Sequence, residues 1–307
     1  MSRNFALQRA REALDGLSVG DAFGQCFFQP AERSDPWLSQ RLAPPGPWPY
    51  TDDTQMSLSV LQALAADAGI ECDALARSLA RHYDYDRAYG PSMHRVLARI
   101  AAGEHWREVA GSSFGGAGSY GNGAAMRAAP VGAYFCDDLD AAIEQATRSA
   151  KVTHLHPEGI AGAVAVTLAA AHACRFRAAG VRPSHARFLA ATIESLPASE
   201  VRSKLVRAQA LERTSSLDHV VALLGNGTLI SAQDTVPYAL WCCAQALEDY
   251  PAALWLAVAA GGDRDTLGAI VGGVVACFVG AQGIPAQWLE RREALPAWPF
   301  ETDEAAS

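Results

Sequence analysis

Helical periodicity is the feature that most limits what this chain can fold into. Apolar residues recur at three- and four-residue spacing in several long segments, which are rich in the strong helix formers alanine and leucine. These segments are residues 5–17, 54–69, 93–103, 139–153, 158–176 and 265–281. Runs of β-branched and aromatic residues with a period of two are scarce. Because no sustained linker or internal repeat divides the chain, we predict one all-α domain over residues 1–307.

Glycine and alanine gather on one face of two of these segments. The small residues are Gly268, Gly272, Gly273 and Ala276 in the segment 265–281, and Ala161, Ala163, Ala165 and Ala169 in 158–176. Small side chains at a contact let two helix axes approach closely. We therefore predict a compact bundle with buried central helices, with loops near residues 29–50, 111–123 and 225–237.

Composition and charge exclude several classes of protein. The net charge is −8, and no Lys/Arg-rich run offsets it, so we expect no binding to a nucleic-acid backbone. The most apolar stretch, residues 254–281, contains Asp263, Arg264 and Asp265, which a membrane span does not tolerate cheaply. The N-terminus lacks the apolar core of a signal peptide, and the seven cysteines are scattered, as is typical of reduced thiols. We predict a cytoplasmic protein that does not bind membranes.

A glycine-rich stretch at residues 113–127 contains the spacing G-x-G-x-x-G at Gly116, Gly118 and Gly121. The dinucleotide fingerprint also requires a buried strand before it, within a β-α-β unit. The residues upstream instead have a helical pattern followed by a polar turn, so we reject NAD binding here. Successive backbone N–H groups of such a loop can bind an anion. A flexible surface loop is the alternative for the same residues.

Two acidic clusters lie at the expected starts of helices. Thr51, Asp52, Asp53 and Thr54 precede one apolar periodic segment, and Asp263, Asp265 and Thr266 precede another. Helix capping explains one such side chain at each start, whereas adjacent carboxylates repel one another. Carboxylate and hydroxyl oxygens are the ligands that Mg²⁺ and Mn²⁺ prefer. If the two clusters converge, they can hold a pair of ions, and capping alone is the alternative.

A third polar element is His154 and His156, followed by Pro157 and Glu158 at the start of a helical segment. Capping with two polar loop histidines is one interpretation. An H-x-H pair can also ligate zinc, but no third nitrogen or sulfur ligand with suitable spacing is evident. The histidines can instead donate hydrogen bonds to a ligand held by the glycine-rich loop.

Five motifs occur together: GDAFG (20–24), TDDT (51–54), GSYGNGAAMRAAP (118–130), THLHPEGIAGA (153–163) and GGDRDT (261–266). In this order they resemble the ADP-ribosylglycohydrolase family, and the resemblance covers about residues 10 to 295. It implies an all-α fold with two divalent ions, Mg²⁺ or Mn²⁺, in a cleft. It also implies hydrolysis of the glycosidic bond that joins ADP-ribose to a side chain, with an ADP-ribosylated protein as substrate and ADP-ribose as product.

The same resemblance assigns roles to residues of this chain. The implied metal ligands are Thr51, Asp52, Asp53, Asp263, Asp265 and Thr266. The implied ligand-binding residues are Phe114, which stacks on adenine, the loop residues Gly118, Ser119, Tyr120, Gly121 and Asn122, and His154. Asp53 and Asp263 are the candidate catalytic carboxylates, and we prefer Asp53 as the group that orients or deprotonates the attacking water.

Three positions depart from the family pattern. Phe28 stands where many relatives have a glutamate that acts near the metals in enzymes cutting serine linkages, so a serine-specific assignment is weakened. Arg264 replaces a common threonine, and Ala88 replaces a glycine in a segment where Asp84 or Asp86 could meet a guanidinium. We take Asp86 as the candidate substrate-binding residue, and solvated surface charge is the alternative for both aspartates. We therefore predict hydrolysis of ADP-ribosylated arginine. The alternatives are a serine, base or metabolite linkage, and a non-catalytic ADP-ribose-binding protein.

Overall fold

The computed structural model describes residues 3–211 and 214–300 and confirms the all-α prediction. This part of the chain has no β-strand, only two isolated bridges. The α-helices are α1 (Arg3–Gln25), α2 (Ala31–Gln40), α3 (Asp52–Asp67), α4 (Cys72–Arg81), α5 (Pro91–Ala101), α6 (Trp106–Ser112), α7 (Ala129–Tyr134), α8 (Leu139–Lys151), α9 (Pro157–Ala178), α10 (His185–Glu194), α11 (Glu200–Ala210), α12 (Leu217–Leu224), α13 (Ala232–Gln245), α14 (Tyr250–Ala259), α15 (Arg264–Val279) and α16 (Ala286–Arg291). Short 3-10 turns are η1 (Ser113–Gly116), η2 (Asn122–Ala124) and η3 (Ala281–Gly283).

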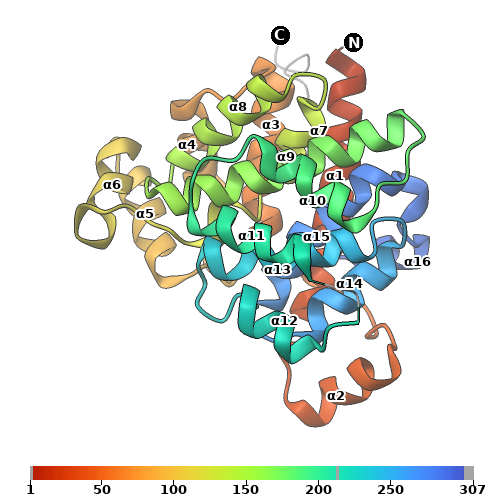
Figure 1. Ribbon diagram of the computed structural model, residues 1–307. Coiled ribbons are helices and arrows are strands. Elements are labelled where there is room, and N and C mark those ends of the chain that lie inside the picture. The colour runs from red at the N-terminus through yellow and green to blue at the C-terminus, as the bar shows by residue number, and fades with distance from the viewer. Residues whose placement is uncertain (1–2, 212–213, 301–307) are drawn as a thin grey trace.

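Helices α1 and α15 pack against each other at the centre of the molecule (Figure 1). Their contact is made of glycines, as the small-residue pattern of 265–281 predicts. A Cβ atom added to Gly20 would lie 2.0 Å from the carbonyl oxygen of Gly268, and one added to Gly16 would lie 2.4 Å from that of Gly272. The two backbones are therefore in direct contact, with no room for side chains between them.

Helix α9 forms another wall of the core and packs against α7, α8, α13 and α15. By length and composition α9 could cross a membrane, but 78% of its most apolar window is buried inside the protein. Being apolar on all sides, it behaves as the core helix of a bundle.

Three expectations about loops are wrong in part. The predicted loop at 29–50 contains helix α2, and the polar turn expected after residue 103 contains helix α6, both at the periphery in Figure 1. Neither helix has a long apolar stripe. Tertiary contacts stabilise both helices instead. Trp37 of α2 packs its ring on Phe27, and the Trp106 indole of α6 donates to Asp73 at 2.6 Å. Similarly, α13 begins at Ala232, inside the third predicted loop.

Candidate functional site

The two acidic clusters meet in one cavity of about 330 Å³. Asp52 and Asp53 enter it from the first turn of α3, and Asp263, Asp265 and Thr266 enter it from the start of α15. The glycine-rich loop and His154 line the same cavity. The structure thus brings together residues from four separate sequence motifs that were singled out on chemical grounds.

Capping accounts for little of this acidity. Thr51 is the N-cap of α3, and its hydroxyl accepts from the Asp53 backbone N–H at 3.4 Å. Asp263 is the N-cap of α15 but accepts no capping bond from that helix. Its carboxylate accepts instead from the Asn122 side-chain amide at 2.6 Å, which joins the glycine-rich loop to the acidic cluster. The aspartates are therefore in excess of what the helix ends need.

Asp21 is an acidic residue of this site that sequence reasoning missed. It lies on α1, is fully buried, and accepts four hydrogen bonds. Its partners are the backbone N–H and hydroxyl of Thr51, at 2.9 and 2.8 Å, and those of Thr54, at 3.1 and 2.5 Å. Asp21 therefore holds the start of α3 in place. The motif GDAFG contained this signal, but nothing local in the sequence showed what its aspartate would bond.

Burial and mutual repulsion dominate the electrostatics of the cluster. Burial raises the pKa of Asp21 to about 6, and burial together with the charge of Asp21 raises the pKa of Asp52 to about 8. The pKa values of Asp53 and Asp265 are raised well above the usual range by burial and then by neighbouring carboxylates. Burial also raises the pKa of Asp263. Without a cation, the cluster opposes full ionisation.

The donor set fits a hard divalent cation. The Asp53 Oδ1 atom is buried and has no hydrogen-bond partner, which costs free energy unless a cation or a proton satisfies it. Carboxylate and hydroxyl oxygens supply the ligands that Mg²⁺ and Mn²⁺ take. Within residues 3–211 and 214–300, however, no three Asp, Glu, His or Cys side chains already form a group able to hold an ion. The acids line one cavity without forming a finished cage.

The ion-free protein should lose stability as the pH rises from about 4 to 8. In that window the folded chain binds more protons than the unfolded chain, because the folded pKa values of Asp21 and Asp52 lie near 6 and 8 against 3.8. At about 1.4 kcal/mol per pKa unit, the shift at Asp21 alone lowers the free energy of unfolding by about 3 kcal/mol across this window, and the larger shift at Asp52 lowers it further. Urea unfolding in EDTA at pH 5 and pH 8 measures this, and adding Mn²⁺ at pH 8 should restore stability. Equal stability at both pH values would contradict the prediction.

The glycine-rich loop forms the wall of the cavity that faces the acids. The Gly121 backbone bridges to Ser231, and the Tyr120 carbonyl accepts from the Ala232 N–H at 2.9 Å. At Gly118, whose φ is 77°, a Cβ would lie 2.8 Å from the His156 nitrogen. The loop from Gly118 onward is thus packed in place. Helix α6 and the turn η1 precede it, and the described residues before it contain no strand, so the G-x-G-x-x-G spacing lacks the strand that a dinucleotide site requires.

Aromatic and aliphatic side chains surround the mouth of the cavity. Phe114 is 53% exposed, has a left-handed φ of 51°, and lies with its ring centroid 5.6 Å from that of Tyr120. Leu229 and Ile230, which sequence reasoning missed, are also exposed there. The Leu229 N–H donates to Asp234 at 2.9 Å. This apolar rim above a polar floor suits a ligand with a flat ring at one end.

The two histidines have different environments. His154 is buried and lines the cavity. His156 caps α9, because its Nδ1 accepts from the Glu158 N–H at 3.1 Å, as the capping interpretation of this pair predicts. Glu158 in turn accepts from the backbone N–H groups of Glu200 and Val201 at the start of α11.

Most of the other candidate positions, Thr51 and Gly118 included, lie outside the cavity lining. Asp86 is exposed, and its backbone N–H donates to Asp84, which pairs with Arg87 at 3.5 Å. Phe28 is 48% exposed in the turn after α1. Arg264 donates to the carbonyl groups of Val258 and Phe27, so it supports the backbone before α15. Ala88, with a left-handed φ of 60°, does line the cavity.

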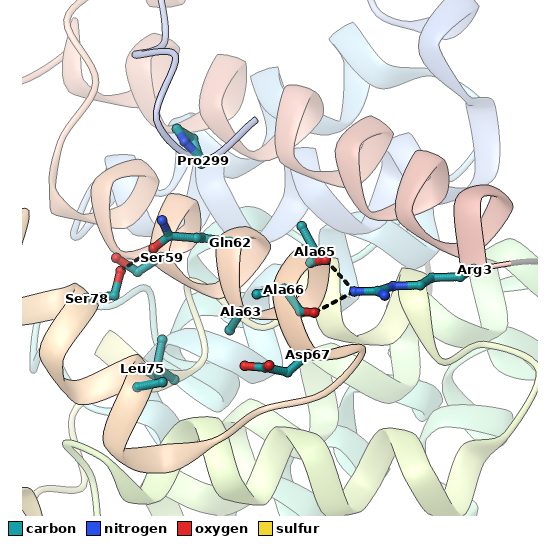
Figure 2. Close-up of a pocket in the computed structure, with 11 residues that line it drawn as sticks. Arg3, Ser59, Gln62, Ala63, Ala65, Ala66, Asp67, Leu75, Ser78 and Pro299 are labelled. Carbon is teal, nitrogen blue, oxygen red and sulfur yellow. Dashed lines mark hydrogen bonds between the residues drawn. The ribbon is translucent and has the colours of Figure 1, made fainter. Parts of the chain in front are cut away.

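A second cavity, of about 390 Å³, lies at the other end of α3. Figure 2 shows Arg3 reaching the carbonyl oxygens of Ala65 and Ala66, and Ser78 bonded to Gln62. Its lining has one carboxylate, Asp67, and none of the residues of the five motifs. The cavity between the starts of α3 and α15 is therefore the candidate site.

A solved structure has the same fold. The chain described as "ADP-ribosylglycohydrolase-related protein complex" superposes with a TM-score of 0.65 and 24% identity, and the match covers 94% of each chain. Among curated proteins, ADP-ribosylhydrolase ARH3 of Mus musculus is 30% identical over 281 residues, covering 80% of this chain and 74% of its own. ARH3 of Homo sapiens is 29% identical, covering 94% and 90%. ADP-ribosylarginine hydrolase Tri1 of Pseudomonas putida is 26% identical, covering 93% and 74%.

Fold, site and relatives together define a helical glycosidic-bond hydrolase. The family model for ADP-ribosylglycohydrolase matches residues 2–305, and the chain belongs to this family. The resemblance drawn from the five motifs is confirmed.

Proposed function

We propose that this enzyme releases ADP-ribose from modified arginine side chains of proteins, with two Mg²⁺ or Mn²⁺ ions as cofactors. One observation carries the proposal: the Asn122 amide bonds the Asp263 carboxylate at 2.6 Å, so the ligand-binding loop and the acidic cluster form one continuous surface. A ligand that lies on the loop therefore ends at the carboxylates. The name of the Pseudomonas putida relative, an ADP-ribosylarginine hydrolase, supports the arginine linkage.

The ions would be held by Thr51, Asp52, Asp53, Asp263, Asp265 and Thr266. When bound, they supply positive charge that lowers the pKa of water and holds ribose hydroxyl groups. In this proposal Asp53 orients the attacking water and accepts its proton, and Asp263 keeps the loop docked through Asn122. The reaction passes through an oxocarbenium-like state at the anomeric carbon, which the carboxylate-rich floor would stabilise.

The other end of the ligand would lie at the aromatic rim. The exposed rings of Phe114 and Tyr120 offer faces for adenine, and the loop residues Ser119–Asn122, which line the cavity, would bind the diphosphate. Phe28 replaces the family's glutamate and lies outside the cavity lining, which argues against a serine-specific enzyme.

We also propose a cytoplasmic location, supported by seven cysteines that are all free thiols.

A linkage panel tests this proposal. Metal-loaded protein is mixed in parallel with proteins ADP-ribosylated on arginine and on serine, and released ADP-ribose is measured with and without EDTA. We expect release from arginine that EDTA abolishes and Mg²⁺ or Mn²⁺ restores. Release from serine alone would overturn the arginine assignment, and tight ADP-ribose binding without turnover on any linkage would indicate a binding protein.

A further inference from the structure

Arg127 is a fully buried cation beneath the glycine-rich loop. Its guanidinium donates to the Gly123 carbonyl, the Ser149 carbonyl and the Thr153 hydroxyl oxygen, each at 2.9 Å. Burying a guanidinium costs free energy, and these three hydrogen bonds offset part of that cost. The partner that leads toward the cavity is Thr153, the residue before His154.

The Thr153 hydroxyl connects Arg127 to His154. A guanidinium has donors only, so the Thr153 oxygen must accept from it. The same oxygen lies 2.7 Å from His154 Nδ1. The Thr153 side chain makes no other hydrogen bond in the described part of the chain, so Nδ1 is the acceptor left for the hydroxyl hydrogen. Thr153 therefore donates to Nδ1, and the ring proton of a neutral imidazole must lie on Nε2.

The other ring nitrogen faces the loop. A Cβ atom added to either Gly121 or Gly123 would lie 3.3 Å from His154 Nε2. The absence of side chains at these two positions leaves Nε2 accessible from the cavity, which His154 lines. Burial, and then the charge of Arg127, lower the pKa of His154 to about 3, so the ring stays neutral at ordinary pH.

We propose that Arg127 and Thr153 are positioning residues that hold His154 as the Nε2–H tautomer, a neutral donor aimed at a phosphate oxygen of the ligand. The identity of that ligand rests on the proposed function, whereas the tautomer does not. A neutral donor suits this site because it binds an anion without adding a titrating charge beside the acidic cluster. The hydrogen-bonded chain from Arg127 through Thr153 to His154 therefore contributes to ligand affinity rather than to the bond-breaking step.

The tautomer can be measured directly in the ligand-free protein. In protein with ¹⁵N-labelled histidine, the nitrogen shifts of His154 should report Nε2–H and should not titrate between pH 5 and 9. Thr153→Val removes the hydroxyl and keeps the shape, so it should give Nδ1–H or a mixture. It should also weaken ADP-ribose binding and raise KM about 10-fold with little change in kcat. Thr153→Ser should restore both.

The matched control is Thr192→Val, because Thr192 is also fully buried, but within the described residues its hydroxyl bonds only the Phe188 carbonyl of its own helix. It should leave the His154 signals and KM unchanged. An Nδ1–H ring in the wild-type protein, or an unchanged tautomer and affinity in Thr153→Val, would overturn the proposal. An Nε2–H ring in wild-type protein that does not bind ADP-ribose would overturn the proposed function and support the tautomer assignment.

Discussion

Asp53→Asn is expected to lower kcat by at least about 1,000-fold, the scale seen when a group central to charge stabilisation is removed. Asp53 is fully buried, and one of its carboxylate oxygens has no hydrogen-bond partner. An amide cannot hold a divalent cation as a carboxylate does, and it cannot accept the proton of water. Release of ADP-ribose from an arginine-linked substrate, measured across a Mn²⁺ titration, gives the result.

The same substitution should stabilise the ion-free protein at pH 8. The Asp53 carboxylate is repelled by four neighbouring carboxylates, those of Asp21, Asp265, Asp52 and Asp263. A neutral amide at this position removes that repulsion. The control is Asp67→Asn, an exposed aspartate at the far end of the same helix, which should leave activity within about 2-fold because surface changes are usually small. Full activity of Asp53→Asn at saturating Mn²⁺ would remove Asp53 from the reaction.

Gly20→Ala is expected to destabilise the fold by at least about 3 kcal/mol, or to prevent folding, because overpacking at a rigid contact cannot be relieved by one side chain. The added Cβ would lie 2.0 Å from the Gly268 carbonyl oxygen, which is backbone and cannot rotate away. Helices α1 and α15 would have to separate along their whole contact, moving Asp21 away from the acids of α15. Thermal and urea unfolding of the purified variant measure the loss.

The matched control is Gly111→Ala in helix α6. There a Cβ would meet only a Leu155 methyl carbon, at 3.6 Å, which is ordinary van der Waals contact. Alanine is the better helix former by about 1 kcal/mol, so this variant should be as stable as wild type or more stable. A Gly20→Ala protein with wild-type stability would show that the α1–α15 contact is wider than the structure has it.

The long helices could be predicted from the sequence because their periodicity is strong and local. The segment 265–281 shows this: its start, its apolar character and its small residues all recur in α15. Helices α2 and α6 escaped prediction because they are short and owe their stability to contacts such as Trp106 with Asp73, 33 residues apart. Propensity alone does not carry that information.

For the site, the sequence by itself determined the chemistry: acids and hydroxyl groups at two helix starts, a glycine-rich loop, and a histidine beside it. Only the tertiary structure decided which of these groups meet. Asp21 bonds Thr51 30 positions away, Arg127 reaches Thr153 across 26, and Asn122 bonds Asp263 across 141. The physical reason is that helix capping and periodicity act over a few residues, whereas these hydrogen bonds exist only once the packing of α1, α9 and α15 has brought distant segments together.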